Sequence, residues 1–250
     1  MRKYSRNILI FLLLFVFVNF SHEKLPKTIE VCSRKNPKLN QCIIDSIKKI
    51  QPYLGSGKLD NEFQITPLEP FAYEGFLINP AHNFNAKVSD VKVYGSSNFT
   101  IEKLRFNIDT LVLDMILQFP KLTLIGKYEM KAKISILDIV GNGDLETINY
   151  NSRMRTRAIG KIGEKDQQVY VDKVNVKIQP GSSTNKLTNL FNGDPLLQDI
   201  GNQLINENQD IFLEYIIPIM EKQFGNVLKS VSNQIISNAT FDELFPDKIV

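Results

Sequence analysis

Side chains that could carry out acid–base or nucleophilic chemistry are scarce in this sequence of 250 residues. Of its two histidines, His22 ends an N-terminal apolar region and His82 lies in a loop-like stretch with proline and asparagine neighbours. A Ser-His-Asp arrangement around His82 stays open, although no Gly-x-Ser-x-Gly nucleophile elbow occurs in the chain. Acidic residues near the C-terminus fall mainly off an apolar stripe and are interpreted as a solvated face: Glu207, Asp210, Glu214 and Glu221. The sequence therefore favours a protein that is not an enzyme, with a lipid esterase centred on His82 as the catalytic alternative.

The two cysteines, Cys32 and Cys42, are ten residues apart. If the chain is secreted, a disulfide is the default, and its small loop would contribute about 2–3 kcal/mol. A metal site with two cysteine ligands is the competing interpretation, but no histidine or further cysteine is near enough in sequence to complete it. We therefore expect neither a metal nor a cofactor.

Residues 1–21 predict a secretory signal peptide, with residues 22–250 as one domain. Arg2, Lys3 and Arg6 precede an uninterrupted apolar run at residues 8–18, which is shorter than the roughly 20 residues that span a bilayer. These three cations account for the formal net charge of +3, so the mature chain is neutral. Neutrality argues against a nucleic-acid binder and against a basic membrane-surface protein. We expect an extracellular protein without stable membrane insertion.

Two sequons could accept N-linked glycans on the secretory route. They are Asn98-Phe99-Thr100 and Asn238-Ala239-Thr240. Either is expected on an exposed turn.

One long helix is expected over residues 196–236. Its apolar residues recur every three or four positions, which places them on one face. Asp194 and Pro195 fit an N-cap and a first helical residue, and Pro218 is expected to bend the helix without ending it. Such a helix would be roughly 60 Å long and needs a partner of matching length. A shorter amphipathic helix is expected at about residues 37–53.

The matching partner is a long predicted strand at residues 122–136. Even positions from Leu122 to Ile136 are almost all apolar and odd positions are mostly polar, which is the period of a strand with one buried face. Pro120 is expected to turn the chain into this strand. At the far end, Gly141-Asn142-Gly143-Asp144 predicts a hairpin turn, because no helix start or Lys-Ser/Thr follows that would suit a phosphate loop.

Weaker alternation predicts the other strands. They are expected at residues 86–94, 101–119, 145–162 and 169–178. The first has a bulge between Val88 and Val91, and the second has a phase slip near 109–110. A polar loop is expected after the last strand, at residues 179–186. Segments broken by prolines are expected at sheet edges: Pro67, Pro70 and Pro80. A row of arginines is interpreted as the solvated face of an outer strand: Arg153, Arg155 and Arg157.

Together these elements predict an α+β fold in which a long C-terminal helix is wrapped by a highly curved antiparallel sheet. Such a tube is hard to fill over its whole length, so large side chains fill it or a cavity remains. An apolar cavity with a few polar groups holds lipophilic ligands. Composition alone leaves a solid core as the alternative.

A resemblance separates these alternatives. The sequence resembles the insect takeout and haemolymph juvenile-hormone-binding protein family over the whole mature length. The matching residues are Pro26, Ile29, Cys32-Ser33-Arg34, Pro37 to Ile43, Ser46-Ile47, Pro52, Leu54, Ile65 to Pro70, Phe119-Pro120, Gly126-Lys127-Tyr128, Gly141-Asn142-Gly143, Val169-Tyr170-Val171, Asn189 to Asp194, Asn206-Glu207-Asn208, Pro218 and Leu244-Phe245-Pro246. A departure lies at residues 58–61, where the family commonly has an apolar or proline-containing segment.

The resemblance implies a tubular lipid-binding fold with an internal hydrophobic tunnel and a disulfide between Cys32 and Cys42. It implies a secreted carrier of juvenile-hormone-like terpenoids or fatty-acid-like lipids, with links to circadian, feeding or chemosensory physiology. A hydroxyl of Tyr128 or Tyr215 would orient the polar end of the ligand. From the inward phase of the predicted elements, we expect the tunnel to be lined by Phe106, Leu113, Met115, Leu117, Phe119, Leu124, Tyr128, Met130, Ile134, Phe212, Tyr215, Ile219 and Phe224. An extracellular interaction protein that binds a receptor and no small ligand remains the main alternative.

Overall fold

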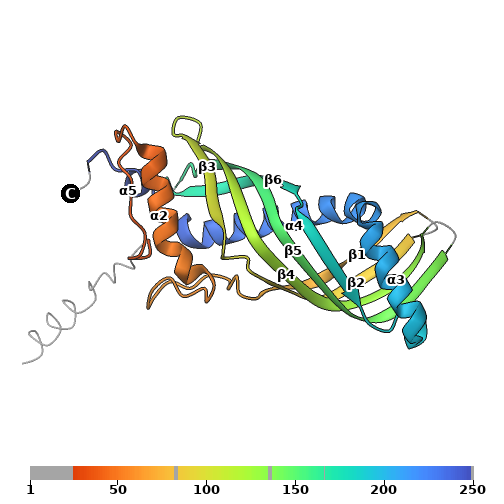
Figure 1. Ribbon diagram of the computed structural model, residues 1–250. Helices are drawn as coiled ribbons and strands as arrows, with labels where there is room; N and C mark the ends of the chain where they lie inside the picture. The colour runs from red at the N-terminus through yellow and green to blue at the C-terminus, as the bar shows by residue number, and fades with distance from the viewer. Residues whose placement is uncertain (1–24, 82–83, 135–136, 166, 249–250) are drawn as a thin grey trace, which may run out of the picture.

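The computed structural model describes residues 25–81, 84–134, 137–165 and 167–248. A curled antiparallel sheet of seven strands wraps around helix α4 (Gln209–Ile236), with α2 (Leu39–Leu54) near one end and α3 (Pro195–Glu207) near the other (Figure 1). This confirms the expected α+β architecture. The predicted signal peptide and His82 lie outside the described residues.

The strands pair in the order β1-β2-β4-β5-β6, while β3 pairs with β4 and β7 pairs with β5. Their bounds are β1 Phe71–Ala81, β2 Phe84–Tyr94, β3 Thr100–Asn107, β4 Val112–Ile134, β5 Leu137–Ile162, β6 Val169–Gln179 and β7 Ser182–Leu187. A short 3₁₀ helix, Phe191–Gly193, precedes α3, and α5 (Phe241–Leu244) follows α4. Pro80 lies on the edge strand β1, as expected. The polar loop predicted at residues 179–186 is wrong, because most of it forms β7.

Strands β4 and β5 are paired along almost their whole length, so the predicted turn at Pro120 is wrong. Pro120 instead lies inside β4, opposite Asn151 of β5, which has a positive φ of 56°. Proline cannot donate to the ladder and asparagine tolerates the left-handed region, so both strands kink at the same level without losing register. On either side of the kink, Phe119 and Leu122 both face the interior, as do Asn149 and Ser152.

The same kink divides the sheet into two halves. β4 pairs with β3 through residues 112–118 and with β2 through 123–132. On its other side, β5 pairs with β6 through 153–162 and with β7 through 145–150. The chain crosses between β6 and β7 at Pro180 and Gly181, where a Cβ on Gly181 would lie 1.9 Å from the Tyr150 carbonyl oxygen. The kink therefore places the ends of four strands at one level of the tube.

The hairpin predicted at residues 141–144 is also wrong, because these residues continue β5. A Cβ on Gly141 would lie 2.5 Å from the Tyr128 hydroxyl oxygen, and one on Gly143 would lie 2.5 Å from the Thr188 carbonyl oxygen. The two glycines allow the segment after β7 to cross close over β5, where Leu190 pairs with Gly141. Glycine marks both tight turns and close backbone approach, and here the second cause applies.

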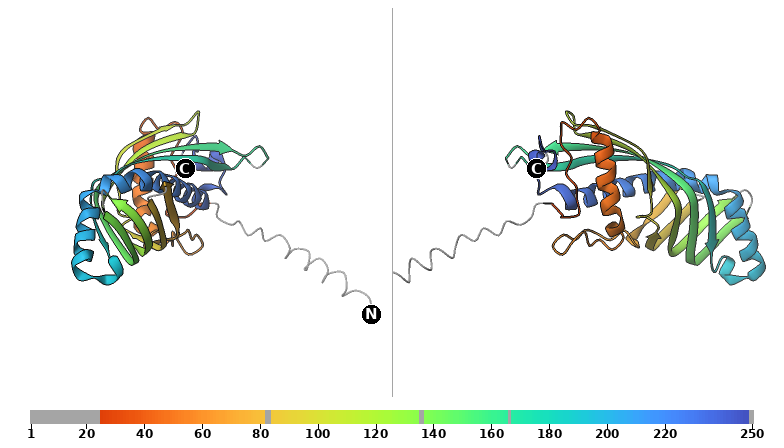
Figure 2. Two further views of the ribbon diagram at one scale, coloured as in Figure 1. Left: turned by 90° about the vertical axis from the view of Figure 1, so that its right-hand side faces the viewer. Right: turned by 60° about the vertical axis from the view of Figure 1, so that its left-hand side comes forward.

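The single helix predicted over residues 196–236 is interrupted at Asn208, which has φ −113° and ψ 29°. The Asn208 backbone N–H makes a last helical bond to the Leu204 carbonyl at 3.0 Å, and its side-chain amide donates to the same carbonyl at 2.8 Å, which caps the end of α3. Helix α3 then lies across the end of the sheet while α4 runs along its concave face (Figure 2). Pro218 lies inside α4 and does not end it.

Other local predictions are confirmed. The β2 bulge occurs where the register shifts between Ser89 and Lys92, with Asp90 at φ 53°. The disulfide between Cys32 and Cys42 joins the N-terminal segment to α2.

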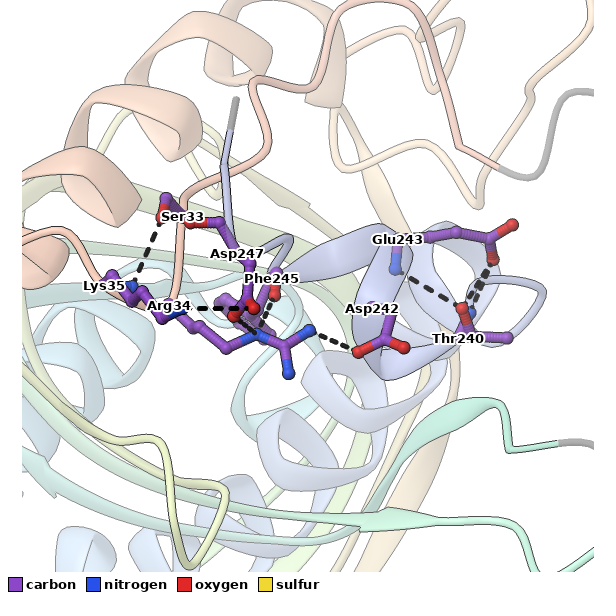
Figure 3. A network of polar contacts seen from close by, with 8 residues as sticks. All are labelled: Ser33, Arg34, Lys35, Thr240, Asp242, Glu243, Phe245 and Asp247. Carbon is purple, nitrogen blue, oxygen red and sulfur yellow. Dashed lines mark hydrogen bonds and ion pairs between the residues drawn. The ribbon is translucent and has the colours of Figure 1, made fainter. Parts of the chain in front are cut away.

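Segments near the two ends of the described chain meet, and Figure 3 shows Arg34 beside Asp242, Phe245 and Asp247. The backbone N–H of Arg34 donates to the Pro246 carbonyl at 3.0 Å, and its Nε donates to the Phe245 carbonyl at 2.6 Å. The guanidinium also binds the Asp242 carboxylate and lies 4.7 Å from the centre of the Phe241 ring. Arg34 therefore fixes α5 and the residues after it to the disulfide-bonded segment.

Candidate functional site

A cavity of about 220 Å³ lies between the concave face of the sheet and helix α4. Most of its wall is apolar because the inward positions of the strands face the apolar stripe of the helix. The apolar lining residues are Phe76, Ile78, Ala86, Val88, Val93, Phe119, Leu122, Leu124, Tyr128, Met130, Leu145, Met154, Ile178, Pro180, Leu187, Ile205, Phe212, Leu213, Ile216, Ile217, Met220 and Phe224.

Neutral polar side chains gather on one part of the wall, which we call the neutral patch. Its members come from β5, β7 and the first turn of α4: Thr147, Asn149, Ser152, Ser183, Asn185 and Gln209. Cross-strand register pairs Thr147 with Asn185 and Asn149 with Ser183, so these side chains are neighbours on one face. The Thr147 hydroxyl donates to Asn185 Oδ1 at 2.9 Å, and the Ser183 hydroxyl donates to Gln209 Oε1.

Two members of the neutral patch have no hydrogen-bond partner for their side chains among the described residues. They are Asn149 and Ser152, which flank the kink at Asn151. Ser152 is 7% exposed, although a buried polar side chain is normally paired. The kink is the reason that both face inward, because residues three apart would otherwise lie on opposite faces of a strand.

The Tyr128 hydroxyl is held within the protein. It donates to the Thr188 carbonyl at 2.7 Å, and the residue is 5% exposed. Burial raises the pKa of this phenol to about 12, because desolvation penalises the phenolate. The ring of Tyr128 thus lines the cavity while its hydroxyl is used in a structural contact.

No member of the neutral patch carries a charge. Arg153 is also a lining residue, but its guanidinium binds the Glu102 carboxylate of β3, with Nε 2.7 Å from Oε2. Within the described ranges, no three His, Cys, Asp or Glu side chains lie close enough together to hold a metal ion. Of the helices that the structure describes, none is both long and apolar enough to cross a membrane.

The cavity brings together six of the residues predicted to line a tunnel. They are Phe119, Leu124, Tyr128 and Met130 from β4, and Phe212 and Phe224 from α4. Their contact with a ligand stays a prediction.

Six others do not line the cavity. Leu117 and Met115 pack in the part of the core that also holds Met154, Val176 and Leu228. Tyr215 and Ile219 pack in the core near α3, Leu113 begins β4, and Phe106 stacks on Phe245 with ring centres 5.1 Å apart. Inward phase placed Met115 and Leu117 correctly on the inner face of β4, where side chains fill the core before the kink. The side chain of Ile134 lies outside the described part of the structure.

Sequence reasoning missed the contributions of β1, β2, β5 and β7 to the cavity. The polar alternation after residue 144 suggested an outer strand, whereas β5 is central, between β4 and β6. Arg155 and Arg157 are exposed as predicted, whereas Arg153 is half-buried and lines the cavity. Thr147 and Asn149 are visible in the sequence as alternating polar residues of one strand, but whether they point inward depends on how that strand pairs.

The asparagines of both sequons are exposed. Asn98 lies in the turn before β3, and Asn238 lies in the turn between α4 and α5. Their modification stays a prediction.

Comparison with known proteins gives consistent results. The sequence model described as "Haemolymph juvenile hormone binding protein (JHBP)" matches residues 10–246. The chain is 27% identical over 201 residues to the circadian clock-controlled protein daywake of Drosophila melanogaster, covering 74% of this chain and 76% of that protein. Daywake of Drosophila yakuba is 26% identical over 200 residues with the same coverage. The crystal structure of Epiphyas postvittana Takeout 1 superposes with a TM-score of 0.74 at 18% identity, covering 87% of this chain and 100% of that one, a likeness of fold.

Proposed function

We propose that this chain, which belongs to the haemolymph juvenile hormone binding protein family, is a secreted carrier of a lipophilic small molecule. The observation that carries the proposal is the internal cavity, with its long apolar wall and one neutral patch. A juvenile-hormone-like terpenoid or a fatty-acid-like lipid is the proposed ligand class.

Binding would be driven by burial. Each Å² of apolar ligand surface removed from water contributes about 25 cal/mol, from which the entropy lost on binding must be subtracted. No bond of the ligand has to be made or broken. The side chains that line the cavity would therefore act by shape and desolvation, with the neutral patch orienting the polar group of the ligand.

The disulfide between Cys32 and Cys42 supports secretion, since such bonds persist on the secretory route. The exposed positions of Asn98 and Asn238 are compatible with glycosylation there. The daywake proteins are named as circadian clock-controlled, and we propose a comparable physiological link for this chain.

The first test is native mass spectrometry of the full chain secreted from insect cells, followed by solvent extraction and identification of any released molecule. We expect one lipophilic molecule per chain. Delipidated protein should then take up a fluorescent lipophilic probe. An empty protein that also takes up no terpenoid or fatty-acyl probe would refute the carrier and favour an extracellular interaction protein.

A matched pair of variants ties binding to the cavity. Leu213→Trp adds bulk to the α4 wall and is expected to weaken probe binding at least about tenfold, since overpacking fills the available space. Leu196→Trp on α3 is the control, because Leu196 is 70% exposed and does not line the cavity. Equal probe binding by both variants would place the site elsewhere. Hydrolysis of an ester probe that is abolished by His82→Ala would instead support the esterase alternative.

A further inference from the structure

We propose that the cavity selects a neutral lipid with a hydrogen-bond acceptor oxygen, such as an ester or ketone, set between a short and a long apolar arm. A lipid that ends in an ionised carboxylate is disfavoured. This inference rests on the proposed carrier function and specifies the ligand class for the same cavity. It is carried by the unpartnered groups of the neutral patch and by their position along the wall.

The unpartnered groups determine the kind of oxygen. Within the described structure, the Asn149 amide and the Ser152 hydroxyl line the cavity without a hydrogen-bond partner. An amide supplies two N–H donors and a hydroxyl supplies one, so the two side chains can converge on a carbonyl or ether oxygen. A ligand that brings such an acceptor satisfies groups that an alkane leaves unpaired, and this difference produces selectivity.

The absence of charge in the neutral patch determines the charge of the ligand. An ionised carboxylate moved into this wall would lose its hydration, and the patch supplies no cation to replace it. Arg153, the lining residue that carries a charge, already binds Glu102 with its guanidinium. A fatty acid should therefore bind in its protonated form, and its affinity should fall as the pH rises above the pKa of the free acid.

The position of the neutral patch determines the two arms. Towards α2, the wall continues from Ser152 only to Met154, Ile178 and Phe224. Towards α3, it continues from Leu122, which pairs with Asn149, as far as Met130. At about 3.3 Å per residue these stretches of strand measure roughly 7 Å and 26 Å, so an oxygen at the patch would have unequal arms.

The test uses four probes with nearly equal carbon number: palmitic acid, methyl palmitate, octyl octanoate and hexadecane. Each displaces a fluorescent lipophilic probe from the delipidated full chain at pH 8. We expect methyl palmitate to bind most tightly, and palmitic acid to bind at least about tenfold more weakly than its ester and to recover as the pH is lowered to 5. Octyl octanoate, with two equal arms, should bind more weakly than methyl palmitate.

Variants of the neutral patch test whether its side chains cause the preference for an ester over an alkane. Asn149→Leu should weaken methyl palmitate binding about three- to tenfold, the range expected for one hydrogen bond, and should not weaken hexadecane binding. Ser152→Ala should act in the same direction. Thr156→Val is the control: Thr156 lies further along β5, is 4% exposed, has an unpartnered hydroxyl and does not line the cavity. It should leave both affinities unchanged.

The outcomes separate this inference from the carrier function. Palmitic acid that binds at pH 8 as tightly as its methyl ester would overturn the inference and leave the carrier intact, as would an Asn149→Leu variant that weakens ester and alkane equally. Failure of every probe to bind would refute the carrier function itself.

Discussion

At Tyr128 one hydroxyl connects the wall of the cavity with the segment that leads into α3. Its bond to the Thr188 carbonyl is possible because Gly141 leaves space beside the phenol oxygen. A side chain at position 141 would occupy the space of this bond. The stability of this end of the tube therefore depends on the Tyr128 hydroxyl and on the absence of a side chain at Gly141.

Replacing Tyr128 with Phe should lower the free energy of unfolding at pH 7 by about 1–2 kcal/mol, since the Thr188 carbonyl loses its donor. The folded-state pKa of about 12 exceeds the ordinary 10.0, so the folded protein holds the phenolic proton more tightly than the unfolded chain. The wild type should thus lose about 2 kcal/mol relative to Tyr128→Phe as the pH rises from 10 to 12. Urea unfolding of both proteins at several pH values measures the difference, and a gap that stays constant up to pH 12 would contradict it.

Gly141→Ala should destabilise the fold by about 1–3 kcal/mol, because the new Cβ would lie 2.5 Å from the Tyr128 oxygen and 3.0 Å from a Leu190 methyl carbon. Gly55→Ala is a suitable control. Its backbone is right-handed helical, with φ −59° and ψ −53°, and the new Cβ would lie 3.2 Å from Glu69 Cγ, a milder contact than the one at Gly141. Thermal unfolding of the two variants checks the prediction, which fails if Gly141→Ala is as stable as the control.

At the level of elements, side-chain amides join the helices to the free edge of the sheet. Asn202 exchanges two hydrogen bonds with the backbone of Leu187, and Asn206 does the same with Asn185. On α4, Asn233 pairs in this way with Val171 of β6. Each amide satisfies one N–H and one C=O that an edge strand would otherwise expose. The tube is therefore closed along β6 and β7 by polar pairing in addition to apolar packing.

Asn206→Ala should reduce stability by about 1–3 kcal/mol, because the Asn185 N–H and C=O lose their partner at a half-buried edge. The amide hydrogen of Asn185 should also exchange faster. The control is Gln203→Ala on the same helix, whose side chain bonds Glu207 on the exposed face at 2.7 Å. Hydrogen exchange combined with urea unfolding tests the pair, and unchanged exchange at Asn185 would show that the edge does not need the amide.

At the scale of the whole molecule, the two ends of the described chain form one structural unit. Arg34 lies two residues after Cys32 and contacts Asp242, Phe245 and the ring of Phe241. The disulfide holds the same segment to α2. The end of the tube near α2 is thus closed by segments more than 200 residues apart in sequence.

Arg34→Gln should lower stability by about 1–3 kcal/mol and expose the residues after α4 to protease, since a hydrogen-bonded cation and its aromatic contact are lost together. Lys35→Gln removes only the exposed ion pair with Asp247, in which the lysine is 68% exposed, and should change stability by no more than about 0.5 kcal/mol. Limited proteolysis with mass analysis of the C-terminal fragments compares the two. Equal protection of that segment in both variants would count against the role of Arg34.

The sequence by itself determined the elements that depend on local pattern. The alternation beyond Leu122 specified a long half-buried strand, the apolar stripe specified α4, and Cys32 with Cys42 specified the disulfide. These features were predictable because period and residue type act along the chain. Six of the predicted lining residues reached the cavity for the same reason.

Only the tertiary structure decided where the chain changes direction and what the cavity contains. Pro120 and the glycines at 141 and 143 carry turn signals, yet strand pairing holds all three inside long strands. Asn149 and Ser152 face the same cavity because the kink at Asn151 shifts the inward phase of β5. A shift of one residue in the inward phase reverses which face of a strand is buried. Pairing with the neighbouring strands sets that phase, and a local sequence pattern does not specify the pairing.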